Sequence, residues 1–119
     1  MKNITKSDLT AFMERFDYAK GGELVYLEVL SPTSFKIALT VQDKNRAFDW
    51  VNLNFECSEV VDAKLVSETA LKAVDMQDGI NIYFEEDEAK IGFGSDEYLS
   101  SPLNFHCKSL KYEESPFEL

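Results

Sequence analysis

Histidine and cysteine are scarce in this sequence. One histidine, His106, and two cysteines, Cys57 and Cys107, stand among 119 residues. A structural zinc site needs four converging ligands, whereas His106 and Cys107 are neighbours in a strand-like segment, where adjacent side chains point to opposite faces. We therefore expect no metal site and no cofactor. Two buried, reduced thiols are the simplest expectation for the cysteines, and a disulfide between them stays an alternative.

Long apolar runs are also absent. No segment approaches the roughly 20 apolar residues that a membrane-spanning helix needs. The first ten residues, MKNITKSDLT, lack the apolar core of a signal peptide. We therefore expect a cytoplasmic protein that does not engage a membrane.

Basic residues are few. The chain has 12 Lys and Arg against 22 Asp and Glu, a net charge of −10. Such a chain repels phosphate, so nucleic acid is not an expected ligand. A basic protein partner fits this charge, and so does the simpler role of acidic residues in keeping a protein soluble.

Catalytic motifs are missing too. The serines have no G-x-S-x-G setting, and the glycines of IGFG lie within a strand-like run instead of opening a helix. His106 has no evident nucleophile beside it. We therefore expect that the protein is not an enzyme.

What is present indicates one ordered domain over residues 1–119. Hydrophobic residues make up 45% of the chain, which is enough for a packed core. Leu9, Phe12, Met13 and Phe16 form the apolar stripe of a first helix that Gly21 and Gly22 would end, and a shorter helix is predicted over 67–74. Six strand-like runs cover residues 23–30, 35–41, 50–57, 80–84, 89–93 and 103–112. The pattern predicts an α+β fold of two helices and about six mostly antiparallel strands, with a loose tail from residue 113.

One short pattern occurs twice. LNFEC at 53–57 returns as LNFHC at 103–107, and each copy ends on one of the two cysteines. Three further matches occur in the same order: residues 4–11 with 66–73, 22–28 with 79–85, and 36–39 with 90–93. This order predicts internal duplication of a helix–strand–strand–strand unit, with pseudo-repeats of about 1–60 and 61–119. Independent patterning of similar amphipathic strands is the alternative.

The acidic residues are concentrated in the second pseudo-repeat. Residues 1–60 carry a net charge of −2, and residues 61–119 carry −8. We expect the clusters to lie in turns, where side chains are free to meet a partner. The candidate partner-binding residues are Glu85, Glu86, Asp87, Glu88, Asp96, Glu97 and an aromatic anchor on the outer side of a strand, Trp50.

These observations favour a non-catalytic, acidic protein-binding module. Immunity-type inhibitors of basic toxins or nucleases share this physical profile of small size and acidity. The element order, helix–three strands–helix–two strands, also resembles type III secretion chaperones, which implies binding of a secreted effector. That resemblance ends where this chain has the strand LNFHCKSLKY in place of a helix. A binder of a small apolar ligand, with Phe residues lining its pocket, is the third alternative.

Overall fold

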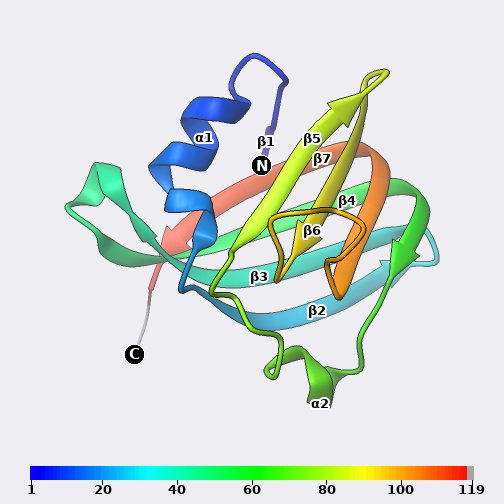
Figure 1. The fold of residues 1–119 in the computed structure, drawn as a ribbon. Coiled ribbons are helices and arrows are strands. Elements are labelled where there is room, and N and C mark those ends of the chain that lie inside the picture. Colours follow the sequence, from blue (N-terminus) through cyan, green and yellow to red (C-terminus); the bar gives the residue numbers. More distant parts are fainter. Residues whose placement is uncertain (118–119) are drawn as a thin grey trace.

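A single antiparallel sheet makes up most of the protein in the computed structural model, which describes residues 1–117 (Figure 1). The strands are β1 (Lys2–Asn3), β2 (Glu23–Ser31), β3 (Ser34–Asp43), β4 (Asp49–Lys64), β5 (Ile80–Glu85), β6 (Glu88–Phe93) and β7 (Leu103–Pro116). The helices are α1 (Leu9–Arg15) and α2 (Glu68–Leu71), with 3-10 turns η1 (Asp17–Ala19) and η2 (Lys44–Arg46). The predicted mostly antiparallel sheet with two helices is confirmed, with the short β1 as an additional strand.

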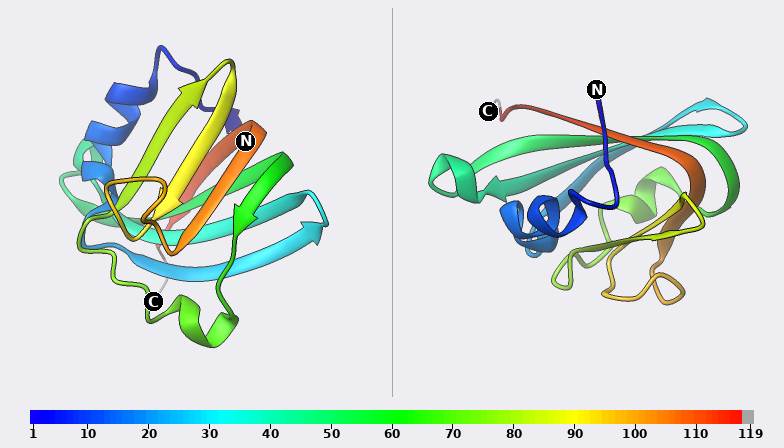
Figure 2. Two further views of the ribbon diagram at one scale, coloured as in Figure 1. Left: turned by 45° about the vertical axis from the view of Figure 1, so that its right-hand side comes forward. Right: turned by 90° about the horizontal axis from the view of Figure 1, so that it is seen from above.

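The strands lie in the order β2-β3-β4-β7-β6-β5, and β1 pairs with β7. The long strands β4 and β7 are therefore the centre of the sheet, and β2 and β5 are its edges. The sheet is strongly curved, with α1 on its concave side (Figure 2). A bulge in β4 between Val60 and Asp62, next to Glu59 with its φ of 52°, contributes to this bend because the extra residue locally increases the twist.

The core fills the concave side of the sheet. The alternation expected in β4 is confirmed, since Val51, Leu53 and Phe55 are buried there while the residues between them face outward. From α1, the ring of Phe12 lies 6.1 Å from that of Phe55 and 4.7 Å from that of Tyr112, measured between centroids. Burial of each such side chain stabilises the fold by about 1.5–3 kcal/mol.

The first helix is shorter than predicted. Its apolar stripe packs as expected, but the helix ends at Arg15 and a left-handed turn follows, with φ values of 49°, 57° and 57° at Asp17, Tyr18 and Ala19. Tertiary packing holds this turn, because the carbonyl of Tyr18 lies directly against Gly79. A Cβ on Gly79 would collide with that oxygen, so only glycine fits. No helix within residues 1–117 has the length and apolar character to cross a membrane.

Two further segments differ from expectation. The second helix begins as predicted, with the Ser67 hydroxyl accepting from the N–H of Ala70 at 3.2 Å, but it ends at Leu71. Leu71 is its one buried side chain, and so short a helix has little stability of its own. The predicted loose tail is wrong up to Pro116, because residues 113–116 extend β7 and pair with 54–51 of β4. The remaining tail residues, 118–119, lie outside the described residues.

The two halves of the sheet share one register. On the concave face, β3 and β4 pair Phe35 with Cys57, Ile37 with Phe55 and Leu39 with Leu53. The corresponding pairs of β6 and β7 are Ala89 with Cys107, Ile91 with Phe105 and Phe93 with Leu103. Apart from Phe35 and Ala89, which directly precede the matched segments, these are the residues that the repeated sequence pattern aligns.

The edge strands do not follow that alignment. The sequence match sets Val25 opposite Ile82, yet Val25 is 42% exposed and Ile82 is buried. Leu24 pairs with Leu39 on the concave face, so the adjacent Val25 points outward, at the position where the register of β2 shifts between Leu24 and Tyr26.

Candidate functional site

The acidic hairpin predicted in the second half is present. Its turn consists of Glu86 and Asp87, with φ values of 52° and 66°, the left-handed geometry of a tight two-residue turn. Both side chains are exposed. The flanking residues Glu85 and Glu88 pair across the two strands, so four carboxylates lie at one tip.

The outer face of β5 and β6 continues from this tip. Tyr83 lies two residues before Glu85 on β5, and its ring packs edge to face against Tyr98 with centroids 6.0 Å apart. The ammonium of Lys90 lies 5.8 Å from the Tyr83 centroid and 5.6 Å from that of Tyr98. It also binds Glu85 at 2.9 Å, and this hydrogen bond lowers the pKa of Glu85 and raises that of Lys90.

The loop of residues 94–102 brings two more predicted residues to this face. The Ser101 hydroxyl donates to the carbonyl of Glu97 at 2.7 Å, and the Asn81 amide donates to Ser101 Oγ at 3.0 Å. Gly92 allows Ser101 to pack this closely, since a Cβ at that position would collide with Ser101 Oγ. Asp96 and Glu97 are thereby held, exposed, beside Tyr83 and Tyr98 around a hollow of about 310 Å3.

We call this surface the acidic face and define it by eight residues: Tyr83, Glu85, Glu86, Asp87, Glu88, Asp96, Glu97 and Tyr98. Six of the seven predicted site residues therefore lie on this hairpin and its neighbouring loop, with Glu85, Glu86, Asp87 and Glu88 at the turn and Asp96 and Glu97 beside Tyr83 and Tyr98, toward the other end of β5. Two of the carboxylates are partly compensated, Glu85 by Lys90 and Glu88 by His106, whose Nε2 is 3.6 Å away. The other four make no ion pair within residues 1–117: Glu86, Asp87, Asp96 and Glu97.

Tyr98 contributes packing to this face. Its ring is buried, and burial raises the pKa of its hydroxyl to about 12. The hydroxyl has no hydrogen-bond partner within the described residues. A phenol that stays protonated at neutral pH is unsuited to act as a base there, and its ring instead provides an apolar floor between the charges.

Trp50, the seventh predicted residue, lies elsewhere. It is 46% exposed at the start of β4, beside Arg46 and Phe117 around a separate hollow of about 500 Å3. The β3–β4 connection next to it and the β5–β6 turn are at opposite sides of the molecule, so Trp50 is not part of the acidic face (Figure 1).

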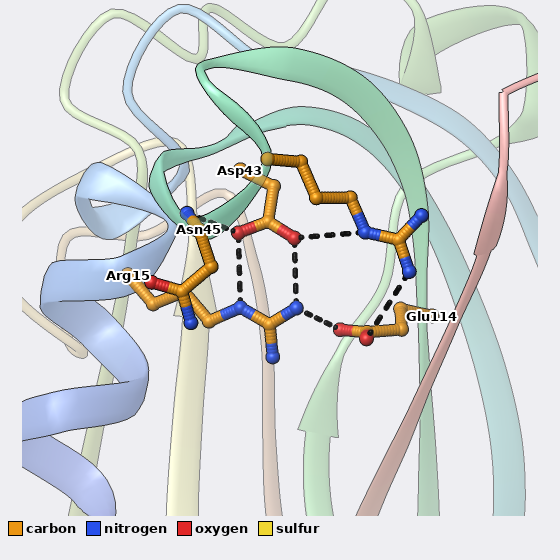
Figure 3. A network of polar contacts seen from close by, with 5 residues as sticks. Arg15, Asp43, Asn45 and Glu114 are labelled. Atoms are coloured by element: carbon orange, nitrogen blue, oxygen red, sulfur yellow. Dashed lines mark hydrogen bonds and ion pairs between the residues drawn. The ribbon is translucent and has the colours of Figure 1, made fainter.

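An ion cluster around a buried aspartate was not expected from the sequence. Asp43 is fully buried and receives two hydrogen bonds from Arg15, 2.9 and 2.7 Å long, and one from the N–H of Asn45 at 2.9 Å (Figure 3). Arg15 also contacts Glu114 at 2.7 Å, and Arg46 contacts both carboxylates. The Arg15 guanidinium lowers the pKa of Asp43, and Asp43 raises that of Arg15.

This cluster joins parts of the fold and is not a site for a ligand. Its two arginines and two carboxylates neutralise each other, and they tie α1 and η2 to the end of β7. The strand pattern contained a signal for it, since Asp43 follows Leu39 and Val41 in alternation and must face the core. A charged side chain that points into the core needs a buried partner of opposite charge.

The two cysteines belong to the core, as expected. Cys57 and Cys107 are free and fully buried on adjacent central strands. A hydrogen bond with Cys107, together with burial, raises the pKa of the Cys57 thiol well above its ordinary value. The protonated Cys57 thiol is a poor nucleophile, and both fully buried side chains contribute packing.

The described residues offer no metal site, because no three His, Cys, Asp or Glu side chains converge among residues 1–117. No family model, curated protein or solved structure matches this chain. The function therefore has to be inferred from the surface itself.

Proposed function

We propose that this protein is a non-catalytic binding module that recognises a basic protein partner through the acidic face. The observation that carries the proposal is that six carboxylates border the outer face of the β5–β6 hairpin, with Glu85 to Glu88 at its turn and Asp96 and Glu97 beside the paired rings of Tyr83 and Tyr98. Aromatic rings supply contact area, and surrounding charges steer and orient a partner of opposite sign. An immunity-type inhibitor of a basic toxin or nuclease is one protein of this kind.

The filled interior supports a protein partner over a small apolar ligand. Phe55, Phe93 and Phe105 are fully buried, and Phe93 packs against the other two with centroids 6.0 and 6.3 Å apart. These rings occupy the space that an apolar ligand would need. The phenylalanines therefore serve the core, and the surface is left to carry recognition.

The secretion-chaperone alternative has weaker support. The order helix–three strands–helix–two strands is present when β1 is set aside. The chain then continues as β7, which is a central strand of the sheet and not a terminal helix. An effector-binding role would therefore depend on surface features of this chain and not on that resemblance.

We further propose that the two halves arose by internal duplication. The shared register on the concave face supports this proposal. The strand order supports it too, because β2, β3 and β4 follow one another inward from one edge of the sheet just as β5, β6 and β7 do from the other edge. The short helix α2 also lies beside β2, as η1 lies against β5. Under this proposal, the register shift in β2 and the different lengths of α1 and α2 arose by divergence after the duplication.

The binding proposal is tested by charge removal on the acidic face. A face variant carries Glu86→Gln, Asp87→Asn, Asp96→Asn and Glu97→Gln. A matched control removes the same charge from exposed residues of the first half, by Glu14→Gln, Asp17→Asn, Glu23→Gln and Glu28→Gln. A partner is captured with the unmodified protein from its native lysate, and its association rate with all three forms is measured at about 0.1 M and about 1 M salt, where the screening lengths are about 10 and 3 Å.

We expect a basic partner that associates more slowly with the face variant than with the control at low salt. The difference should shrink at high salt, because screening removes the steering contribution. An acidic partner, or equal rates for the two variants at low salt, would show that the acidic face serves solubility alone.

A further inference from the structure

A groove of about 350 Å3 runs between α1 and the edge strand β5. Leu9 and Met13 of α1 line one wall, and Ile80 and Ile82 of β5 line the other. Thr10 of α1 is exposed along it. The rest of the lining is more polar and includes Tyr18, Lys20, Asp78, Asn81 and Asp96. The groove thus combines apolar walls with carboxylates and adjoins the acidic face through Asp96.

The wall formed by β5 presents unpaired backbone groups. In the β5–β6 hairpin, the N–H of Gly94 donates to the carbonyl of Gly79 at 2.8 Å, and Glu85 faces Glu88 across the two-residue turn. Backbone groups alternate in direction along an antiparallel strand. The odd-numbered residues therefore bond to β6, and the N–H and C=O groups of Ile80, Ile82 and Phe84 point away from it. Within residues 1–117, β5 pairs with no strand other than β6.

We propose that this groove binds an extended, basic segment of the protein partner, which adds to β5 as a further antiparallel strand. Strand addition uses main-chain hydrogen bonds for affinity and alternate side chains for specificity. In an antiparallel pair, residues opposite Ile80, Ile82 and Phe84 place their side chains on the concave side, toward Leu9 and Met13. Those positions suit apolar residues. The intervening side chains emerge on the outer face, where the carboxylates favour Lys or Arg.

Charge favours a basic segment of the partner over a second copy of this chain as the occupant of the groove. Two copies carry −10 each, and β5 ends at Glu85, which the turn residues Glu86 and Asp87 follow. Like charges along an edge oppose pairing with an identical strand, whereas they favour a basic one. This inference rests on the proposed function, since it specifies how the basic partner is bound.

The test uses a labelled synthetic peptide, acetyl-Lys-Val-Lys-Val-Lys-Val-Lys-amide, and two backbone-methylated forms. Methylation of the valine nitrogens removes the N–H groups that would face β5, and methylation of the inner lysine nitrogens removes groups that face away. Binding is measured by fluorescence anisotropy, and exchange of the Ile82 and Phe84 amides is followed by NMR. We expect the unmodified and lysine-methylated peptides to bind and to protect these amides. Loss of about three hydrogen bonds should weaken the valine-methylated form about tenfold or more.

Two variants of α1 locate the binding. Thr10→Trp places a ring in the groove, and the matched Ala11→Trp places the same ring toward a different hollow, beside Phe12 and Arg15. With both variants folded, as checked by their thermal midpoints, Thr10→Trp should weaken peptide binding about tenfold or more. Ala11→Trp should leave it unchanged.

Three results would overturn strand addition. They are absence of saturable peptide binding up to about 1 mM, equal binding by the two methylated peptides, and self-association of the protein that Thr10→Trp abolishes. If the methylated peptides bind equally while the charge-removed face variant binds less, recognition by the acidic face stands and only strand addition fails. If the captured partner is acidic, the proposed function itself fails.

Discussion

The two halves of the sheet share an inner face and differ on the outer one. Across β2, β3, β4 and β7, the outer face carries a row in which each residue pairs with one of opposite charge: Glu28, Lys36, Glu56 and Lys111. Across β5 and β6, the outer face is acidic and partly covered by the loop of residues 94–102. The inner face must fill one shared core, which restricts it to similar side chains, whereas the outer face is free to diverge.

The sharpest test of the shared inner face is truncation of its equivalent aromatic residues. Phe55→Ala and Phe105→Ala each remove a fully buried ring that packs against Phe93. We expect each to lower the free energy of unfolding by about 3–5 kcal/mol, measured by urea denaturation. Val29→Ala, at a residue that is 61% exposed, should change it by less than about 0.5 kcal/mol. A large difference between the two Phe variants would mean that the central strands are not equivalent in packing.

Two glycines with nearly the same φ allow the cost of a left-handed backbone to be measured separately from the cost of a steric clash. Gly21 and Gly79 have φ values of 74° and 72°, but a Cβ on Gly21 meets nothing within 4 Å, while one on Gly79 collides with the carbonyl of Tyr18. Gly21→Ala should cost about 1–2 kcal/mol of stability through φ alone. Gly79→Ala should cost at least about 3 kcal/mol, since η1 must move away from β5. Equal losses in chemical denaturation would contradict the close contact of η1 with β5.

The ion cluster joins the first half to the end of β7 and should dominate the response of the protein to acid. Because the folded-state pKa of Asp43 is lowered, its contribution is complete above the ordinary carboxyl pKa of about 4 and is lost as the pH falls through the folded value. Asp43→Asn should lower the free energy of unfolding by about 2–3 kcal/mol at pH 7, since Arg15 keeps Glu114 as a partner. The difference from the unmodified protein should narrow in acid. A difference that stays constant down to pH 2 would show that Asp43 acts through packing and not through its charge.

The smallest effect on stability should come from the acidic face. Removing the four unpaired charges with the face variant should change the free energy of unfolding by less than about 0.5 kcal/mol, or raise it slightly, because exposed like charges repel one another. Thermal midpoints of the face variant and the matched first-half control should agree. A marked loss in the face variant alone would indicate that Asp96 or Glu97 holds the loop of residues 94–102 in place.

The sequence was informative wherever a short segment decides its own structure. The alternation in residues 50–57 correctly predicted which side chains of β4 enter the core, and the polar run at 85–88 correctly predicted a hairpin turn. Most residues of the candidate site could be predicted from the sequence for the same reason, since charged residues in a turn stay in water. The groove beside β5 could not be predicted, because its walls come from segments about 70 residues apart and neither segment has a distinctive pattern alone.

By itself, the sequence determined the strands, the faces that they bury and the unequal distribution of charge, because each depends on the nature and spacing of neighbouring residues. Tertiary structure alone decided the central pairing of β4 with β7, which turns residues 113–116 from an expected tail into strand. It also decided the left-handed end of the first helix, where Gly79 receives Tyr18, and the burial of Asp43 between two arginines. Each of these depends on groups that are distant in sequence, or on a charge whose burial is tolerable only once its partner is in place.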